Sequence, residues 1–160
     1  MADPRRTADR VEELWVRTRC VELGARYCHG VDQADQATFL SVWHADGEYV
    51  IGRRAGRFRG HAELASALDF VRAAYVSTHH WTTNQVVTRT GTGSATGVSD
   101  SFAVCVDHDD RPTLVAATYD DEYRLVGEEW KIWRRIVRRW LVSDGIEVAL
   151  RHPASVQARP

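Results

Sequence analysis

The chain has 160 residues, 44% of them hydrophobic, which suits one domain with its own core. Its 21 basic and 22 acidic residues give a net charge of -1, so it lacks the basic surplus typical of nucleic-acid-binding and anionic-membrane-binding proteins. We therefore predict a small-molecule substrate, no nucleic acid and no membrane among its partners.

The predicted domain covers residues 1–160, with a core at about 8–142 and an irregular C-terminal tail at 143–160. No apolar run approaches the roughly 20 residues that cross a bilayer, and MADPRRTADR has no apolar signal core. These features predict a cytoplasmic protein. The cysteines, Cys20, Cys28 and Cys105, show no CxxC or Cys/His spacing, so we expect reduced core residues and no metal site.

The first half of the chain has helical periodicity. Apolar residues at helical spacing predict a first helix over residues 7–29, in which Val11, Leu14, Trp15, Val21 and Leu23 belong to the apolar set. A second helix is predicted from Asp32 to about residue 45, with Asp32 as a possible N-cap. GEYVIG then predicts a short strand, RRAGRFRG a turn with another short strand, and residues 61–76 a third helix.

The second half consists of four β-rich segments, at residues 77–89, 94–107, 113–126 and 129–142, separated by turn-like or polar stretches. Long strands with short connections predict an antiparallel meander. Helices followed by a curled sheet indicate an α+β fold in which the helices cover one face of the sheet and enclose a pocket.

Two adjacent histidines stand in the first of these strands, in STHHWTTN. Alternation places His80 and Asn84 on one face and His79 and Trp81 on the other, but it does not say which face is concave. An aspartate that accepts a hydrogen bond from an imidazole fixes its tautomer and lets the other nitrogen act as a base. Asp32 could supply that carboxylate. It could equally be only a helix cap, and a strand histidine is often only a packed or surface residue.

The order of the elements, with ARYCHGVDQAD, STHHWTTNQ, TYDDEY and EEWKIWRR, resembles the nuclear-transport-factor-2-like superfamily in its SnoaL-like and scytalone dehydratase branch. Within that branch, the segments are similar to those of dehydrochlorinase-like and bile-acid-dehydratase-like proteins. The resemblance covers about residues 8–142. It implies a cone-shaped α+β barrel, with three N-terminal helices packed on a strongly curved, mainly antiparallel sheet that encloses a pocket.

Carried over by position, the resemblance implies that Asp32 and His80 form a catalytic dyad, which leaves His79 on the opposite face. Tyr27 stands where dehydratase-like members hold the substrate oxygen and where dehydrochlorinase-like members have a lysine. A tyrosine donates a hydrogen bond to a carbonyl or a leaving hydroxyl, which favours loss of water over loss of chloride.

The resemblance also places Arg135 where some dehydrochlorinase-like enzymes have a cavity arginine. Regular alternation would group Arg135 with Lys131 and Trp133, so Arg134 is a rival unless a bulge reverses the faces. Asn84 could instead only bond to the backbone, and Arg135 could be one member of a solvated surface stripe. Asp100 and Cys105 occupy the region where a second catalytic histidine is found in scytalone dehydratase, and Asp100 is more simply a surface aspartate.

Aromatic residues suited to line the pocket are Tyr49, Trp81, Phe39 and Phe102, each of which could also belong to the core. The predicted substrate-binding residues are accordingly Arg135, Asn84, Tyr49 and Trp81, and the predicted catalytic residues are Asp32, His80 and Tyr27. An apolar outer face with Trp133, Trp140 and Val87 predicts a homo-oligomer, either a dimer or a trimer.

The resulting functional prediction is a cofactor-independent lyase, a dehydratase acting on a cyclic or polyketide-like small molecule by Asp/His proton abstraction. An aldol cyclase, an isomerase and a non-catalytic binding module are the alternatives, since this fold carries all of these functions. No cofactor is expected, because GxGxxG, GxxxxGK[ST] and HExxH are missing from the sequence.

Overall fold

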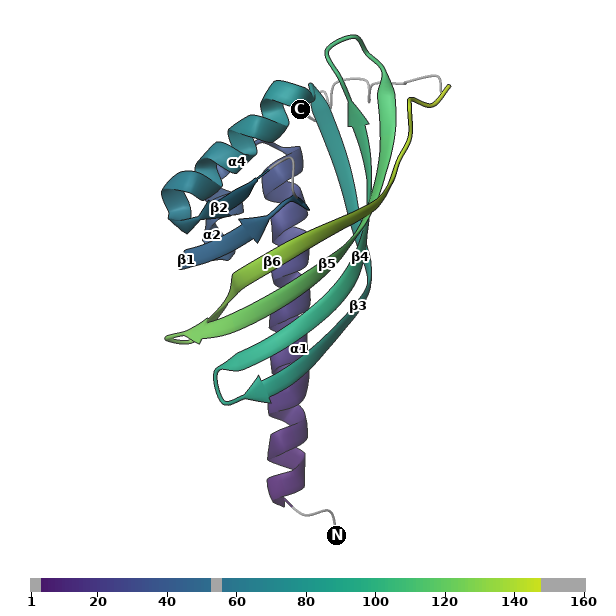
Figure 1. Cartoon of the computed structure of the whole chain (residues 1–160). Helices are drawn as coiled ribbons and strands as arrows, with labels where there is room; N and C mark the ends of the chain where they lie inside the picture. The colour runs from purple at the N-terminus through teal and green to yellow at the C-terminus, as the bar shows by residue number, and fades with distance from the viewer. Residues whose placement is uncertain (1–3, 53–55, 148–160) are drawn as a thin grey trace, which may run out of the picture.

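Figure 1 shows the computed structural model of the chain, which describes residues 4–52 and 56–147. Its elements in chain order are α1 (Pro4–Asp32), α2 (Gln36–Ser41), β1 (Trp43–Val50), β2 (Arg57–Arg59), α4 (Gly60–Ala74), β3 (Ser77–Gly91), β4 (Ser94–Val106), β5 (Pro112–Val126) and β6 (Glu129–Val142). Three helices thus precede four long strands, as the sequence predicts.

The six strands form one mixed sheet in the order β2-β1-β6-β5-β4-β3. All neighbours are antiparallel except β1 and β6, which are parallel. The sheet does not close into a barrel, because β2 and β3 remain its two edges. The four long strands curve past α1, while α4 covers β1 and β2 (Figure 1). The predicted α+β fold with a curved, mainly antiparallel sheet is confirmed, in an open form.

Helix α1 is longer than predicted and ends at Asp32. Gly30 does not terminate it, because glycine is needed there for packing: a Cβ at Gly30 would lie 2.6 Å from the backbone nitrogen of Phe39. The added turn brings Asp32 onto the helix. The buried face is Val16, Cys20, Leu23, Tyr27 and Val31, whereas the predicted apolar residues Val11, Leu14, Trp15 and Val21 are exposed.

The N-cap of α2 is Asp35, and the hypothesis that Asp32 caps this helix is wrong. The Asp35 carboxylate accepts the backbone N–H of Thr38 at 3.1 Å and its hydroxyl at 2.6 Å. Helix α2 ends at Ser41, earlier than predicted, because Trp43 already begins β1. Residues 53–55 of the predicted turn RRAGRFRG lie outside the described residues.

A bulge in β3 changes which side chains face the core. The pairing of β3 with β4 shifts register between Thr83 and Val86, and Asn84 has a φ of 52°. Beyond it, Val87 is buried, which contradicts its predicted place on the outer face. A regular alternation would have put Asn84 and His80 on the same face, and the bulge breaks that alternation.

A second bulge, in β6, decides between the two candidate arginines. Arg134 pairs with Glu122 and Ile132 with Tyr123, so Trp133 is one residue too many on its strand. Arg135 is therefore on the same side as the buried Ile132 and is itself fully buried. The bulge therefore reverses the two faces of β6 from this point on, and Arg135 points into the protein.

Residues 143–147 continue without helix or strand, and the N–H of Ile146 donates to Pro112 O at 3.0 Å. The remainder of the predicted tail, residues 148–160, lies outside the described part. None of the described helices combines the length and the apolar character that crossing a membrane requires. The cytoplasmic location and the homo-oligomer remain predictions. Trp140, one of the residues predicted for the apolar outer face, is 65% exposed.

Candidate functional site

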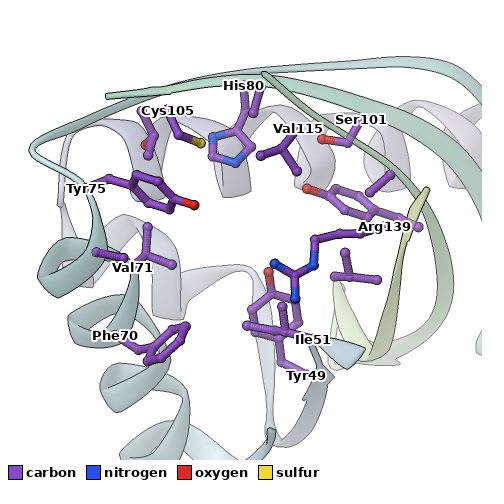
Figure 2. A pocket seen from close by; sticks show the side chains of 16 residues that line it. Tyr49, Ile51, Phe70, Val71, Tyr75, His80, Ser101, Cys105, Val115 and Arg139 are labelled. Atoms are coloured by element: carbon purple, nitrogen blue, oxygen red, sulfur yellow. The ribbon is translucent and has the colours of Figure 1, made fainter. Parts of the chain in front are cut away.

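A cavity of about 250 Å³ opens between the long strands and α4 (Figure 2). Its wall is mostly apolar, with several hydroxyl groups, one imidazole and one guanidinium. The lining residues are Tyr49, Ile51, Phe70, Val71, Ala74, Tyr75, Thr78, His80, Ser101, Ala103, Cys105, Val115, Ala117, Tyr119, Val137 and Arg139. An apolar cavity with a few placed polar groups is the usual form of a small-molecule site.

The predicted dyad of Asp32 and His80 is assembled at this cavity. His80 Nδ1 lies 2.6 Å from Asp32 Oδ1, and the His80 backbone N–H donates to Oδ2 at 2.9 Å. The hydroxyl of Thr78 also donates to Oδ1, at 2.9 Å. Strand β3 is an edge of the sheet, so the last residue of α1 can accept this amide where a further strand would otherwise pair. Figure 2 shows the imidazole pointing into the cavity.

The carboxylate of Asp32 is kept ionised by its neighbours. Burial alone would raise the pKa of Asp32, but the hydrogen bonds from His80 and Thr78 and the His80 charge together lower it below its ordinary value. A carboxylate can only accept hydrogen bonds, so Nδ1 carries the shared proton, and in the neutral form of the ring Nε2 holds a free lone pair. That nitrogen can take a proton from a bound molecule.

The predicted Tyr27 lies behind the cavity and not in its wall. Its ring is 2% exposed, and its hydroxyl is 2.5 Å from the hydroxyl of Tyr49, which does line the cavity. Burial raises the pKa of Tyr49, while the bond with Tyr27 and the charges of Arg135 and Arg139 lower it in part. When Tyr49 donates to a ligand, Tyr27 can donate to Tyr49. Tyr27 is therefore placed to position Tyr49.

Arg135 is also behind the cavity, as part of a buried ion pair. Its Nε and Nη2 each donate to the Asp121 carboxylate at 2.7 Å, and its guanidinium lies 4.4 Å from the ring centres of both Tyr27 and Tyr119. Burial alone would lower the pKa of Arg135, but the Asp121 charge outweighs it and raises that pKa well above its ordinary value. Arg135 does not line the cavity, so the structure does not support its predicted contact with substrate.

The arginine that reaches the cavity is Arg139, four residues further along β6. Arg134, the rival of Arg135, instead lies on the opposite face and pairs with Glu48 at 2.8 Å. Alternation from Arg135 through Val137 does group Arg139 with the inward residues, so the sequence contained a signal for it. In the sequence, however, Arg139 is one of several closely spaced arginines, which together look like a single basic cluster.

The structure does not bring Asn84 to the cavity. Its amide donates to Asp100 at 3.1 Å, and Thr118 donates to the same carboxylate at 3.1 Å, on the outer side of the sheet. The simpler interpretation of Asp100 as a surface residue therefore fits this placement. Cys105, by contrast, is buried and lines the cavity near His80 (Figure 2).

Trp81 lies on the face opposite to His80. It is 51% exposed, its ring stacks on His79 at 6.2 Å between centroids, and Phe102 lies beside it. Trp81 lines a separate groove of about 590 Å³ between α1 and β3, which also reaches Asp32 and His80. Phe39, another predicted lining residue, is buried in the core.

Sequence reasoning missed the hydroxyl groups of Thr78, Ser101 and Tyr119. Thr78 could have been found, because it lies two residues before His80 and shares its face. Tyr119 belongs to the TYDDEY segment, but nothing in that segment marks which of its residues reaches the cavity. Among residues 4–52 and 56–147, no group of three or more His, Cys, Asp or Glu side chains is placed to hold a metal ion.

A family comparison matches most of the chain. The sequence model of the SnoaL-like domain matches residues 12–136. Comparison with curated protein sequences gives no match.

Solved structures share the fold at low sequence identity. A hexachlorocyclohexane dehydrochlorinase of type 2 has a TM-score of 0.82 at 20% identity, over 91% of this chain and 99% of that chain. A candidate scytalone dehydratase from Novosphingobium aromaticivorans DSM 12444 has 0.76 at 17%, over 89% and 95%. A candidate aromatic ring hydroxylase from Novosphingobium aromaticivorans has 0.74 at 26%, over 81% and 92%. These names span different reactions, so the choice among them depends on the site.

Proposed function

Since this chain belongs to the SnoaL-like domain family, we propose that it is a lyase of the dehydratase type, acting on a small cyclic or polyketide-like molecule. The observation that supports this most is the Asp32–His80 pair, 2.6 Å apart, with the imidazole directed into an apolar cavity. Its side chains are only 12% and 13% exposed, so competition from solvent is limited.

In the proposed reaction, Nε2 of His80 removes a proton from the carbon next to a substrate carbonyl. The carboxylate of Asp32 stabilises the imidazolium that forms. The phenol of Tyr49 donates to the carbonyl oxygen as negative charge develops on it. The C–O bond at the β carbon then breaks, the imidazolium returns its proton to the departing hydroxyl, and water leaves with a new C=C bond.

The proposal favours loss of water over loss of chloride, the reaction in the name of one structural neighbour. Phenol hydroxyls at the cavity, from Tyr49 and Tyr119, are suited to hydrogen-bond a carbonyl or hydroxyl oxygen. Hexachlorocyclohexane offers no such oxygen. It is therefore the natural contrast substrate, and we expect cyclic β-hydroxy ketones to react faster.

Proton abstraction can be tested before the natural substrate is known. Cyclic β-hydroxy ketones are incubated with the protein in deuterated water, and NMR follows deuterium entry at the carbon next to the carbonyl and formation of the enone. We expect both deuterium entry and enone formation from a dehydratase. An isomerase or a cyclase would give deuterium entry without the enone. Exchange at the buffer rate across the whole panel would support a non-catalytic binding module instead.

The phenols should differ in their effect on the rate. Tyr49→Phe removes the donor to the substrate oxygen, and we expect a loss of about 10²-fold, as for other single donors of this kind. Tyr27→Phe removes only support for Tyr49, so we expect roughly a tenfold loss, in kcat more than in KM. The measurement is the deuterium exchange rate, with thermal unfolding as a check on folding. The opposite ranking would make Tyr27 the direct donor.

A further inference from the structure

Arg139 places a positive charge in a cavity whose described lining residues include no acidic one. None of these described side chains is Asp, Glu or Lys, so besides the imidazole of His80 the guanidinium is the only basic group among them. Figure 2 shows Arg139 entering from one wall and His80 from another. Tyr49 lines the same cavity as Arg139, and the Arg139 charge lowers the pKa of Tyr49 in part.

The other arginines of this strand are already paired. Each has a carboxylate partner: Arg134 with Glu48 and Glu122, Arg135 with Asp121, and Arg138 with Asp120. For Arg139, no described residue supplies one. The fold therefore satisfies three neighbouring guanidinium groups internally and leaves the fourth, in the cavity, without a protein anion among residues 4–52 and 56–147.

Water solvates this guanidinium while the cavity is open, because Arg139 is an exposed residue. A ligand that fills the cavity displaces the part of that water that lies inside it. A neutral, apolar ligand would offer the guanidinium no hydrogen-bond acceptor in exchange. A ligand with an anionic group would replace the lost water by charge-assisted hydrogen bonds, in the two-pronged geometry that a planar guanidinium offers to a carboxylate.

We propose that Arg139 binds a carboxylate of the substrate, so that the substrate class is a β-hydroxy ketone of one or two rings that bears a carboxylate. The ring limit follows from the volume of about 250 Å³, just below the roughly 300–1,000 Å³ of pockets for drug-sized ligands. The carboxylate lies at the Arg139 end and the acidic C–H faces His80. The reaction assigned to this substrate rests on the proposed function, whereas the anion site does not.

The test compares a matched pair of ligands, naphthoate and naphthamide, by isothermal titration calorimetry. The two differ in charge and little in shape. We expect naphthoate to bind roughly tenfold more tightly, the preference that one charge-assisted hydrogen bond provides. In Arg139→Gln this preference should fall to about one, with naphthamide affinity nearly unchanged because the cavity is intact.

Arg138→Gln is the matched control, since Arg138 is the adjacent residue and pairs with Asp120 outside the cavity. It should keep the full preference for naphthoate. Equal affinity of the wild type for both ligands, no binding of naphthoate at millimolar concentration, or a preference that survives Arg139→Gln would each overturn the proposal. So would a preference lost equally in Arg138→Gln.

His80→Gln separates this inference from the proposed function. The variant should still prefer naphthoate, because the base does not contact the carboxylate. If the variant keeps this preference while the wild type shows no proton exchange on any ketone, the anion site is supported and the proposed lyase activity is contradicted. Proton exchange without a preference for naphthoate gives the reverse result.

Discussion

Replacing His80 with glutamine should slow proton exchange on a reactive ketone by about 10²- to 10⁴-fold, the usual contribution of a positioned general base. Glutamine fills most of the space of the ring and can still hydrogen-bond Asp32, but it has no basic nitrogen. The loss should therefore appear in kcat, with ligand binding retained. Exchange rates in deuterated water and calorimetric titration with naphthamide measure the two effects separately.

His79→Gln is the matched control, because His79 is the adjacent residue on the same strand. It is exposed and stacks on Trp81, away from the cavity. The rate of this variant should stay within about threefold of the wild type, as expected for a residue outside the site. A loss of less than about threefold in His80→Gln, or an equal loss in both variants, would remove His80 from the role of base.

Breaking the buried pair of Arg135 and Asp121 should strongly destabilise the protein. Asp121→Asn leaves a fully buried guanidinium without its counter-charge, and such losses typically cost about 3–5 kcal/mol. The two flanking tyrosine rings offset little of this, because a cation–π contact contributes roughly 0.5–2 kcal/mol and is already present. Urea unfolding gives the change in free energy.

The exposed pair of Arg138 and Asp120 provides the comparison, since it joins the same two strands on the outer face and Asp120 is the neighbour of Asp121. Asp120→Asn should cost less than about 1 kcal/mol, as exposed ion pairs do. Replacing both Arg135 and Asp121 by apolar residues should recover much of the stability lost in the single variant. Equal costs for Asp121→Asn and Asp120→Asn would contradict the importance of burial.

The elements of this fold are largely predictable because they depend on local patterns. Helical spacing in α1 and α4 and long β-branched runs in the strands identify each element and its order. Their ends are less predictable, since a tertiary contact decides them. Gly30 looks like a helix stop, yet its missing side chain serves the close approach of Phe39, and the helix continues to Asp32.

The candidate site is harder to predict because two bulges decide which side chains face inward. Alternation cannot reveal a bulge, and the one local sign in β3 is an asparagine, a residue that tolerates the positive φ of Asn84. The dyad was predictable only through the resemblance, since 48 residues separate Asp32 and His80. The depth of Tyr27 below Tyr49 depends on how α1 packs on the sheet, which no local pattern encodes.

The tautomer of His80 tests the central claim most directly, and no substrate is needed. NMR of protein with isotope-labelled histidine, at alkaline pH, distinguishes the protonated from the unprotonated ring nitrogen. We predict a proton on Nδ1, shared with Asp32, and a free lone pair on Nε2, with this preference lost in Asp32→Ala. A wild-type ring protonated on Nε2, or one unaffected by Asp32→Ala, would contradict the proposed base.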